Sequence, residues 1–145
     1  MKEIHIAIGV LAIALSAAAF FWGAYCYWRS DASTWFWRLL RSSQVAIVLE
    51  AALGGIYAIN HKTPSIHIIY GVLPILVSFL AEQLRVASAQ MVLDRQGFES
   101  SADVGELPES EQLGVVQSIV LREMGVMTLA ALVCIVLLAR AAGTA

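Results

Sequence analysis

The chain has 145 residues, of which 59% are hydrophobic and 14% are charged, and its formal net charge is -2. This composition excludes an ordinary soluble domain, in which about a quarter of the residues are charged. The slightly negative charge offers no basic surface for nucleic acid. At this length we expect a single domain.

Four stretches of the sequence are apolar over a length that can cross a bilayer, which takes about 20 helical residues. In chain order they are residues 4–28, 35–59, 65–93 and 113–138. The polar residues 94–112 contain two glycines and a proline and are predicted to form a surface loop. The sequence therefore predicts an all-α integral membrane protein, a four-helix up-down bundle whose partner is the lipid bilayer.

The first and third of these helices share a segment. The letters IHIAIGVLAI at residues 4–13 recur as IHIIYGVLPI at residues 66–75, with His5 matched to His67. Similarity at a fixed offset indicates a duplicated structural unit. Since two helices per unit leave the copies parallel, we expect two duplicated helical hairpins related by a twofold axis along the membrane normal.

Lysine and arginine are distributed unequally between the two ends of the predicted bundle. We call the end that holds both termini the terminal end, and the end that holds residues 94–112 the loop end. The terminal end carries Lys2, Lys62 and Arg140, and the loop end carries Arg29, Arg38, Arg41, Arg85, Arg95 and Arg122. Because cytoplasmic ends are enriched in Lys and Arg, we expect a multi-pass cell-membrane protein with extracytoplasmic termini.

A histidine and a glycine recur together in the first and third helices. His5 and Gly9, like His67 and Gly71, are four residues apart, so each pair shares a helical face. These helices are diagonal in a four-helix bundle, roughly 11–14 Å apart when neighbours are 8–10 Å apart, which is close to the span of two axial imidazoles and an iron. We expect His5 and His67 to bind one b-type haem near the extracytoplasmic face, with the glycines leaving space for the ring and Tyr70 beside it.

The HIAIG and HIIYG elements and the four-helix architecture resemble bis-histidine membrane cytochromes of the cytochrome b561 type and of the haem A synthase fold. The resemblance implies haem b, a role in electron transfer or haem handling, and a redox protein or a quinone as partner. The loop end has no second histidine pair, so a two-haem relay is not expected. The cations of the terminal end are expected to pair with the haem propionates.

The histidines also allow a small metal site. His5, His61 and His67 are all expected at the terminal end, and three imidazoles suit Cu or Zn. This alternative explains all three histidines but not the paired glycines.

Glu50 suggests a different function. It lies in the interior of the second helix, with no basic residue expected at its depth, and an ionisable group within a membrane is functional or paired. We expect Glu50 either to be uncharged or to accept hydrogen bonds from Ser16 or Ser78. An uncharged Glu50 suits a proton carrier in a proton- or ion-coupled transporter. A further alternative is an accessory subunit of a homo- or hetero-oligomer.

Charged residues of both signs lie within a turn or two of the loop end. They are Arg38, Arg41, Glu82, Arg85, Arg122 and Glu123. Opposite charges on neighbouring membrane helices pair with one another, so we expect an ion-pair lattice that fixes helix register. The alternative is a substrate or quinone site at this end.

Overall fold

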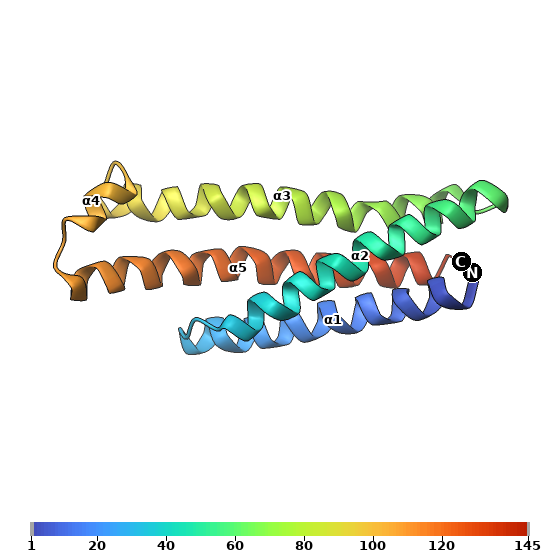
Figure 1. The fold of residues 1–145 in the computed structure, drawn as a ribbon, viewed down its shortest axis with the longest axis horizontal. Helices are drawn as coiled ribbons and strands as arrows, with labels where there is room; N and C mark the ends of the chain where they lie inside the picture. Colours follow the sequence, from blue (N-terminus) through green and yellow to red (C-terminus); the bar gives the residue numbers. More distant parts are fainter. Residues whose placement is uncertain (1, 145) are drawn as a thin grey trace.

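The computed structural model describes residues 2–144, and all regular structure in this range is helical (Figure 1). The helices are α1 (Lys2–Arg29), α2 (Thr34–Asn60), α3 (Ser65–Gln96), α4 (Ser101–Gly105) and α5 (Glu109–Ala142). All except α4 are long and apolar enough to span a membrane. The prediction of four membrane-compatible helices is confirmed, and each helix begins and ends within four residues of the predicted bounds.

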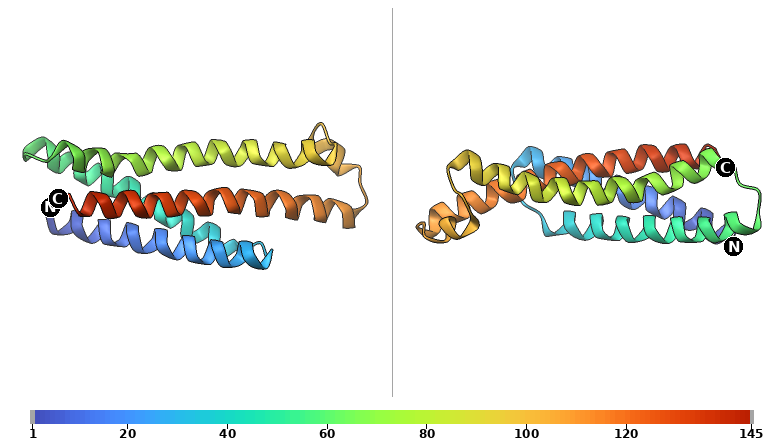
Figure 2. Two further views of the ribbon diagram at one scale, coloured as in Figure 1. Left: turned by 180° about the vertical axis from the view of Figure 1, so that it is seen from behind. Right: turned by 90° about the horizontal axis from the view of Figure 1, so that it is seen from above.

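The four long helices pack side by side, and both termini lie at the same end of the molecule (Figure 1). Seen from behind, α5 lies between α1 and α3 and contacts both (Figure 2). On the other side, α2 crosses obliquely from α1 to α3, and its contact with α3 is the least extensive of the four neighbouring pairs. As a result, α1 and α3 face one another across the bundle interior.

The α3–α5 hairpin extends beyond the turn that joins α1 to α2 (Figure 1). Gln117 of α5 donates a hydrogen bond to the carbonyl of Ser30 in this turn, at 3.1 Å, so the first two turns of α5 lie beyond it. The extension has a small core of its own, made of Leu93, Val104 and Val115 with Phe98, Leu107 and Ile119 packed against them.

Residues 94–112 were predicted to be a surface loop, but they contain the short helix α4. Ser100 and Asp103 form a capping box at its start, an arrangement that satisfies two free backbone N–H groups. Gly97 ends α3 in the left-handed conformation, with φ of 82°, which glycine adopts without a steric penalty. Gly97 thus ends α3, and the capping box then begins α4 within the connection.

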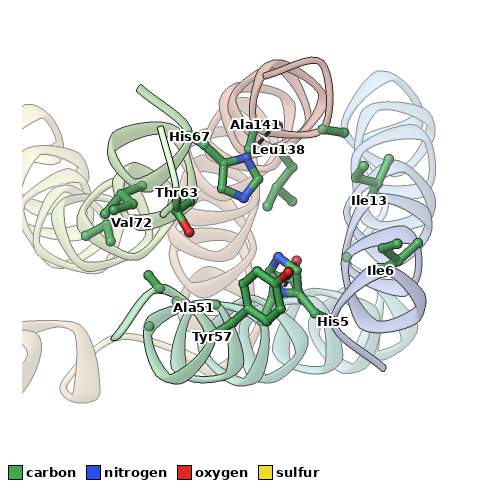
Figure 3. Close-up of a pocket in the computed structure, with 18 of the residues that line it drawn as sticks. His5, Ile6, Ile13, Ala51, Tyr57, Thr63, His67, Val72, Leu138 and Ala141 are labelled. Carbon is green, nitrogen blue, oxygen red and sulfur yellow. Dashed lines mark hydrogen bonds and ion pairs between the residues drawn. The ribbon is translucent and has the colours of Figure 1, made fainter. Parts of the chain in front are cut away.

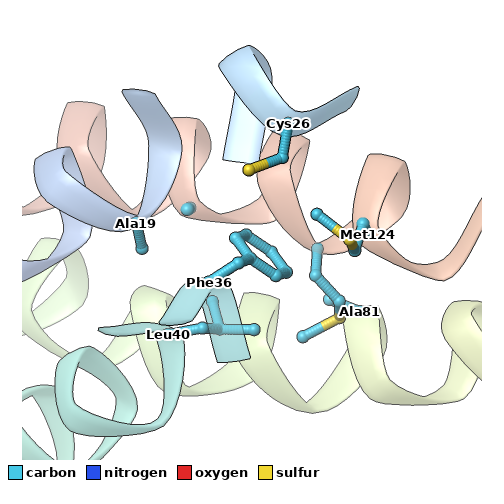
Figure 4. Packing of buried hydrophobic residues seen from close by; sticks show 8 residues of the cluster. Ala19, Cys26, Phe36, Leu40, Ala81 and Met124 are labelled. Atoms are coloured by element: carbon cyan, nitrogen blue, oxygen red, sulfur yellow. The ribbon is translucent and has the colours of Figure 1, made fainter. Parts of the chain in front are cut away.

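The loop-end half of the bundle interior is filled by side chains. Phe36 of α2 is fully buried among Ala19 and Cys26 of α1, Ala81 of α3 and Met124 of α5 (Figure 4). One large ring is thus surrounded by small and flexible side chains from the other three helices. This half of the bundle is closely packed, whereas the opposite half contains a cavity.

The predicted ion-pair lattice is present around Arg85 of α3. Its Nε lies 3.2 Å from Glu82 Oε2, and its Nη1 lies 3.6 Å from Glu123 Oε2 on α5. Glu82 also binds Arg41 of α2. Arg38 and Arg122, which were also predicted to belong to the lattice, form no ion pair within residues 2–144. The lattice joins α2, α3 and α5 at the loop end.

Candidate functional site

A cavity of about 370 Å³ lies among α1, α2, α3 and α5 in the terminal-end half of the bundle (Figure 3). Its polar lining residues are His5, Glu50, Tyr57, Thr63 and His67, and the remainder of its wall is apolar or glycine. Small-molecule sites are typically apolar cavities of roughly 300–1,000 Å³ with a few polar groups. The size and lining of this cavity make it the candidate site.

His5 and His67 enter the cavity from opposite sides, one from α1 and one from α3 (Figure 3). Their ring centres are 6.1 Å apart and their planes are inclined at 73°. Two metal–nitrogen bonds of about 2 Å, plus about 1 Å from each nitrogen to its ring centre, separate axial imidazoles by about 6 Å. The structure therefore brings the two predicted ligands together at a separation that suits one metal ion.

Each of these two imidazoles has an oxygen atom beside its Nδ1. His67 Nδ1 is hydrogen-bonded to the carbonyl oxygen of Ala141 at 2.9 Å, and His5 Nδ1 lies 3.1 Å from Glu50 Oε1. Neither Nε2 takes part in a hydrogen bond within residues 2–144. Histidines that bind metals usually present their second ring nitrogen to a carboxylate or a carbonyl, and both Nδ1 atoms have such an oxygen beside them.

Glu50 does not contact the predicted serines. Ser16 is hydrogen-bonded to Ser43 at 2.7 Å, and Ser78 contacts Cys134 at 3.9 Å. Glu50 lies seven residues after Ser43, or about 10 Å along α2. This places its carboxyl nearer the terminal end than Ser16.

The prediction that Glu50 has no basic residue at its depth is also wrong, because His5 lies against it. The two groups are within ion-pair distance but are not aligned as a hydrogen bond. Among the residues described, His5 Nδ1 and Glu50 Oε2 are buried atoms without a hydrogen-bond partner. The pair therefore presents unsatisfied polar groups at the cavity wall.

The two predicted glycines have different surroundings. A Cβ at Gly9 would lie 2.7 Å from Glu50 Oε1, whereas a Cβ at Gly71 would meet no atom within 4 Å. Gly9 thus provides space for the carboxyl of Glu50, and Gly71 borders open cavity. Gly54 was not among the predicted site residues, although it lies four residues after Glu50 on the same helical face. A Cβ at Gly54 would lie 3.1 Å from His5 Cε1.

The other predicted site residues lie outside the cavity. His61 stacks on Tyr57, with ring centres 4.0 Å apart, and Tyr57 is in turn nearly parallel to His5 at 6.4 Å. Tyr70 lies beneath the guanidinium of Arg140. Nowhere in residues 2–144 do three His, Cys, Asp or Glu side chains form a group that could hold a metal ion. The structure thus brings two of the three histidines into one cavity. Tyr57, which was not among the predicted site residues, also lines that cavity.

Comparison of the chain with models of known protein families, with curated proteins and with solved structures gives no match.

Proposed function

We propose that this chain is a membrane cytochrome that binds one b-type haem between His5 and His67. The observation that carries the proposal is the pair of imidazoles, 6.1 Å apart across a ligand-sized cavity. Each ring has an oxygen beside Nδ1, and neither Nε2 is hydrogen-bonded within the described residues. Two protein ligands are sufficient for haem, whereas Cu or Zn at the predicted three-histidine site requires His61 as well.

Haem held by axial side chains supplies one-electron chemistry. In this chain, His5 and His67 would be the axial ligands, and Glu50 and the carbonyl of Ala141 would orient them. The cations proposed for the propionates are Lys2, Lys62 and Arg140. From the excess of Lys and Arg at the loop end, we place the site at the extracytoplasmic side of the cell membrane. Its function there is electron transfer or haem handling, with a redox protein or a quinone as partner.

The pattern of contacts supports the duplication and the up-down arrangement that the proposal includes. Two contacts in the α1–α2 hairpin have equivalents in the α3–α5 hairpin. These are Ser16–Ser43 with Ser78–Cys134, and His5–Glu50 with His67–Ala141. In both cases the residue of α3 is 62 positions after its equivalent in α1, and the residue of α5 is 91 positions after its equivalent in α2. Two symmetric hairpins would place equal ligands at equal depth, as a bis-histidine site requires.

The absorption spectrum of the protein purified from haem-replete cells tests the proposal. We expect a Soret band and the visible bands of low-spin haem. His5→Ala and His67→Ala should each abolish the low-spin spectrum because each removes an axial ligand. His61→Ala is the matched control and should retain it, since its ring lies outside the cavity. A colourless protein without iron would refute the proposal.

Proton- or ion-coupled transport is the second candidate, because Glu50 lines the cavity with Oε1 beside His5, while its buried Oε2 has no hydrogen-bond partner in residues 2–144. Ionisable residues within membranes commonly mark proton relays, and Glu50 would be the residue that accepts and releases the proton. Flux measured in vesicles that contain the colourless protein would support transport if Glu50→Gln abolishes it. An inactive, colourless protein would instead favour the accessory subunit.

A further inference from the structure

The cavity reaches the outer surface of the bundle between α2 and α3. Gly55 of α2 lines the cavity and is also exposed. On α3, Ile68 and Val72 line the cavity and are 43% and 52% exposed. Ala51 and Val72 border this opening from the two helices (Figure 3). We call the opening bordered by Ala51, Gly55, Ile68 and Val72 the lateral portal.

The opening results from small residues at a place where α2 and α3 do not pack. A Cβ at Gly55 would meet no atom within 4 Å. The two helices are joined by Arg41 and Glu82 at the loop end and by the turn at residues 61–64 at the terminal end. Between these two connections, nothing larger than alanine projects from α2 at positions 51, 55 and 58.

The portal has an apolar outside and a polar inner end. Both α2 and α3 are long and apolar enough to span a membrane, so the portal opens to hydrocarbon when they do. At its inner end are His5, Glu50 and His67, including two buried polar atoms without hydrogen-bond partners in the described chain. A molecule that passes through therefore needs an apolar periphery and a centre that binds imidazole.

We propose that the lateral portal is the route by which haem passes between the bilayer and the site. The inference rests on the proposed function, because it concerns the same two histidines. Haem fits this description, since its ring is apolar apart from the edge that bears the two propionates, and its iron binds imidazole nitrogen. Loading from the bilayer also avoids transfer of an apolar ring through water. The competing route is the α1 side of the cavity, where Val10 lines the wall and is 62% exposed.

The rate of haem loading tests the portal. Haem-free protein in phosphatidylcholine vesicles is mixed with vesicles that contain haem, and growth of the Soret band is followed by stopped flow. Gly55→Leu places a side chain in the portal, and Val72→Trp narrows it from the facing helix. Each should slow loading by about tenfold or more, the effect of a modest added barrier. The rate is compared with the amount of haem that each variant finally binds, so that slower entry is separated from weaker binding. Gly114→Leu is the matched control, because this glycine of α5 also has no atom within 4 Å of a Cβ and does not line the cavity.

Two results would overturn the inference and leave the proposed function intact. One is loading of both portal variants at the rate of the unaltered protein. The other is slowed loading in Val10→Phe but not in Gly55→Leu or Val72→Trp, which would assign entry to the α1 side. If the unaltered protein takes up no haem from vesicles or from solution, the proposed function fails together with the portal.

Discussion

Alanine substitutions at two glycines, Gly23 and Gly71, should change stability in opposite directions. A Cβ at Gly23 would lie 2.3 Å from Thr128 Oγ1 and 2.6 Å from Phe36 Cε2. Ordinary carbon contacts are about 3.5 Å, so the overlap with Phe36 approaches 1 Å. The ring of Phe36 is fully buried in the core cluster and cannot rotate into free space. The helices must separate to admit one methyl group.

The magnitude follows from two opposing effects. Overpacking a well-packed core costs about 1–3 kcal/mol, and replacing glycine by alanine within a helix regains at most about 1 kcal/mol. Gly23→Ala should therefore lower the free energy of unfolding by about 1–2 kcal/mol. At Gly71, where a Cβ meets no atom within 4 Å, only the helix propensity changes. Gly71→Ala should raise stability by up to about 1 kcal/mol.

The assay is reversible unfolding in mixed detergent micelles, with helix content followed by circular dichroism. Both variants replace glycine with alanine within a long helix, so each serves as the control for the other. If Gly71→Ala proves as destabilising as Gly23→Ala, the site half of the bundle is filled rather than hollow. That result would remove the basis for a ligand site there.

The remaining predictions concern the site and its orientation. Gly71→Leu should lower haem occupancy without touching a ligand, because its side chain enters the cavity; unchanged haem content per protein would contradict this. Glu50→Gln should leave the protein folded but lower haem affinity about 10–100-fold, as loss of a partner of a metal-binding histidine does; titration with haem measures the change. In intact cells, Glu3→Cys should react with an impermeant thiol reagent and Ser100→Cys should not, and the opposite labelling would place the termini in the cytoplasm.

The sequence predicts the helices well because length and apolar content decide them. The four long helices have 27 to 34 residues and few charges. An apolar segment of this length in a bilayer forms a helix, because its backbone groups must be hydrogen-bonded within the segment. The repeat at residues 4–13 and 66–75 also identified the two histidines that the cavity brings together. Both predictions depend on patterns within single helices, where the period of the helix fixes which residues share a face.

Contacts between helices were predicted less well, since they depend on register. Glu50 was expected beside Ser16, but α2 pairs Ser43 with Ser16 and presents Glu50 to His5 about two turns further on. The partner of His67 is a main-chain carbonyl, which leaves no trace in the identity of residue 141. Gly9 was expected to leave space for a ring and instead admits the carboxyl of Glu50.

If the two hairpins are duplicates, His5 and His67 occupy equivalent positions, and the groups beside their Nδ1 atoms can be compared directly. His5 has a carboxyl beside its Nδ1, whereas His67 at the equivalent position has a backbone carbonyl. A carboxyl group that is ionised increases the basicity of an imidazole ligand more than a neutral carbonyl does. Gly9 and Gly54 are the residues that admit this asymmetry, because side chains there would displace Glu50 and His5. The proposed repeat would supply equal ligands but differs at one residue, Glu50, and Gly9 and Gly54 leave the space in which Glu50 reaches His5.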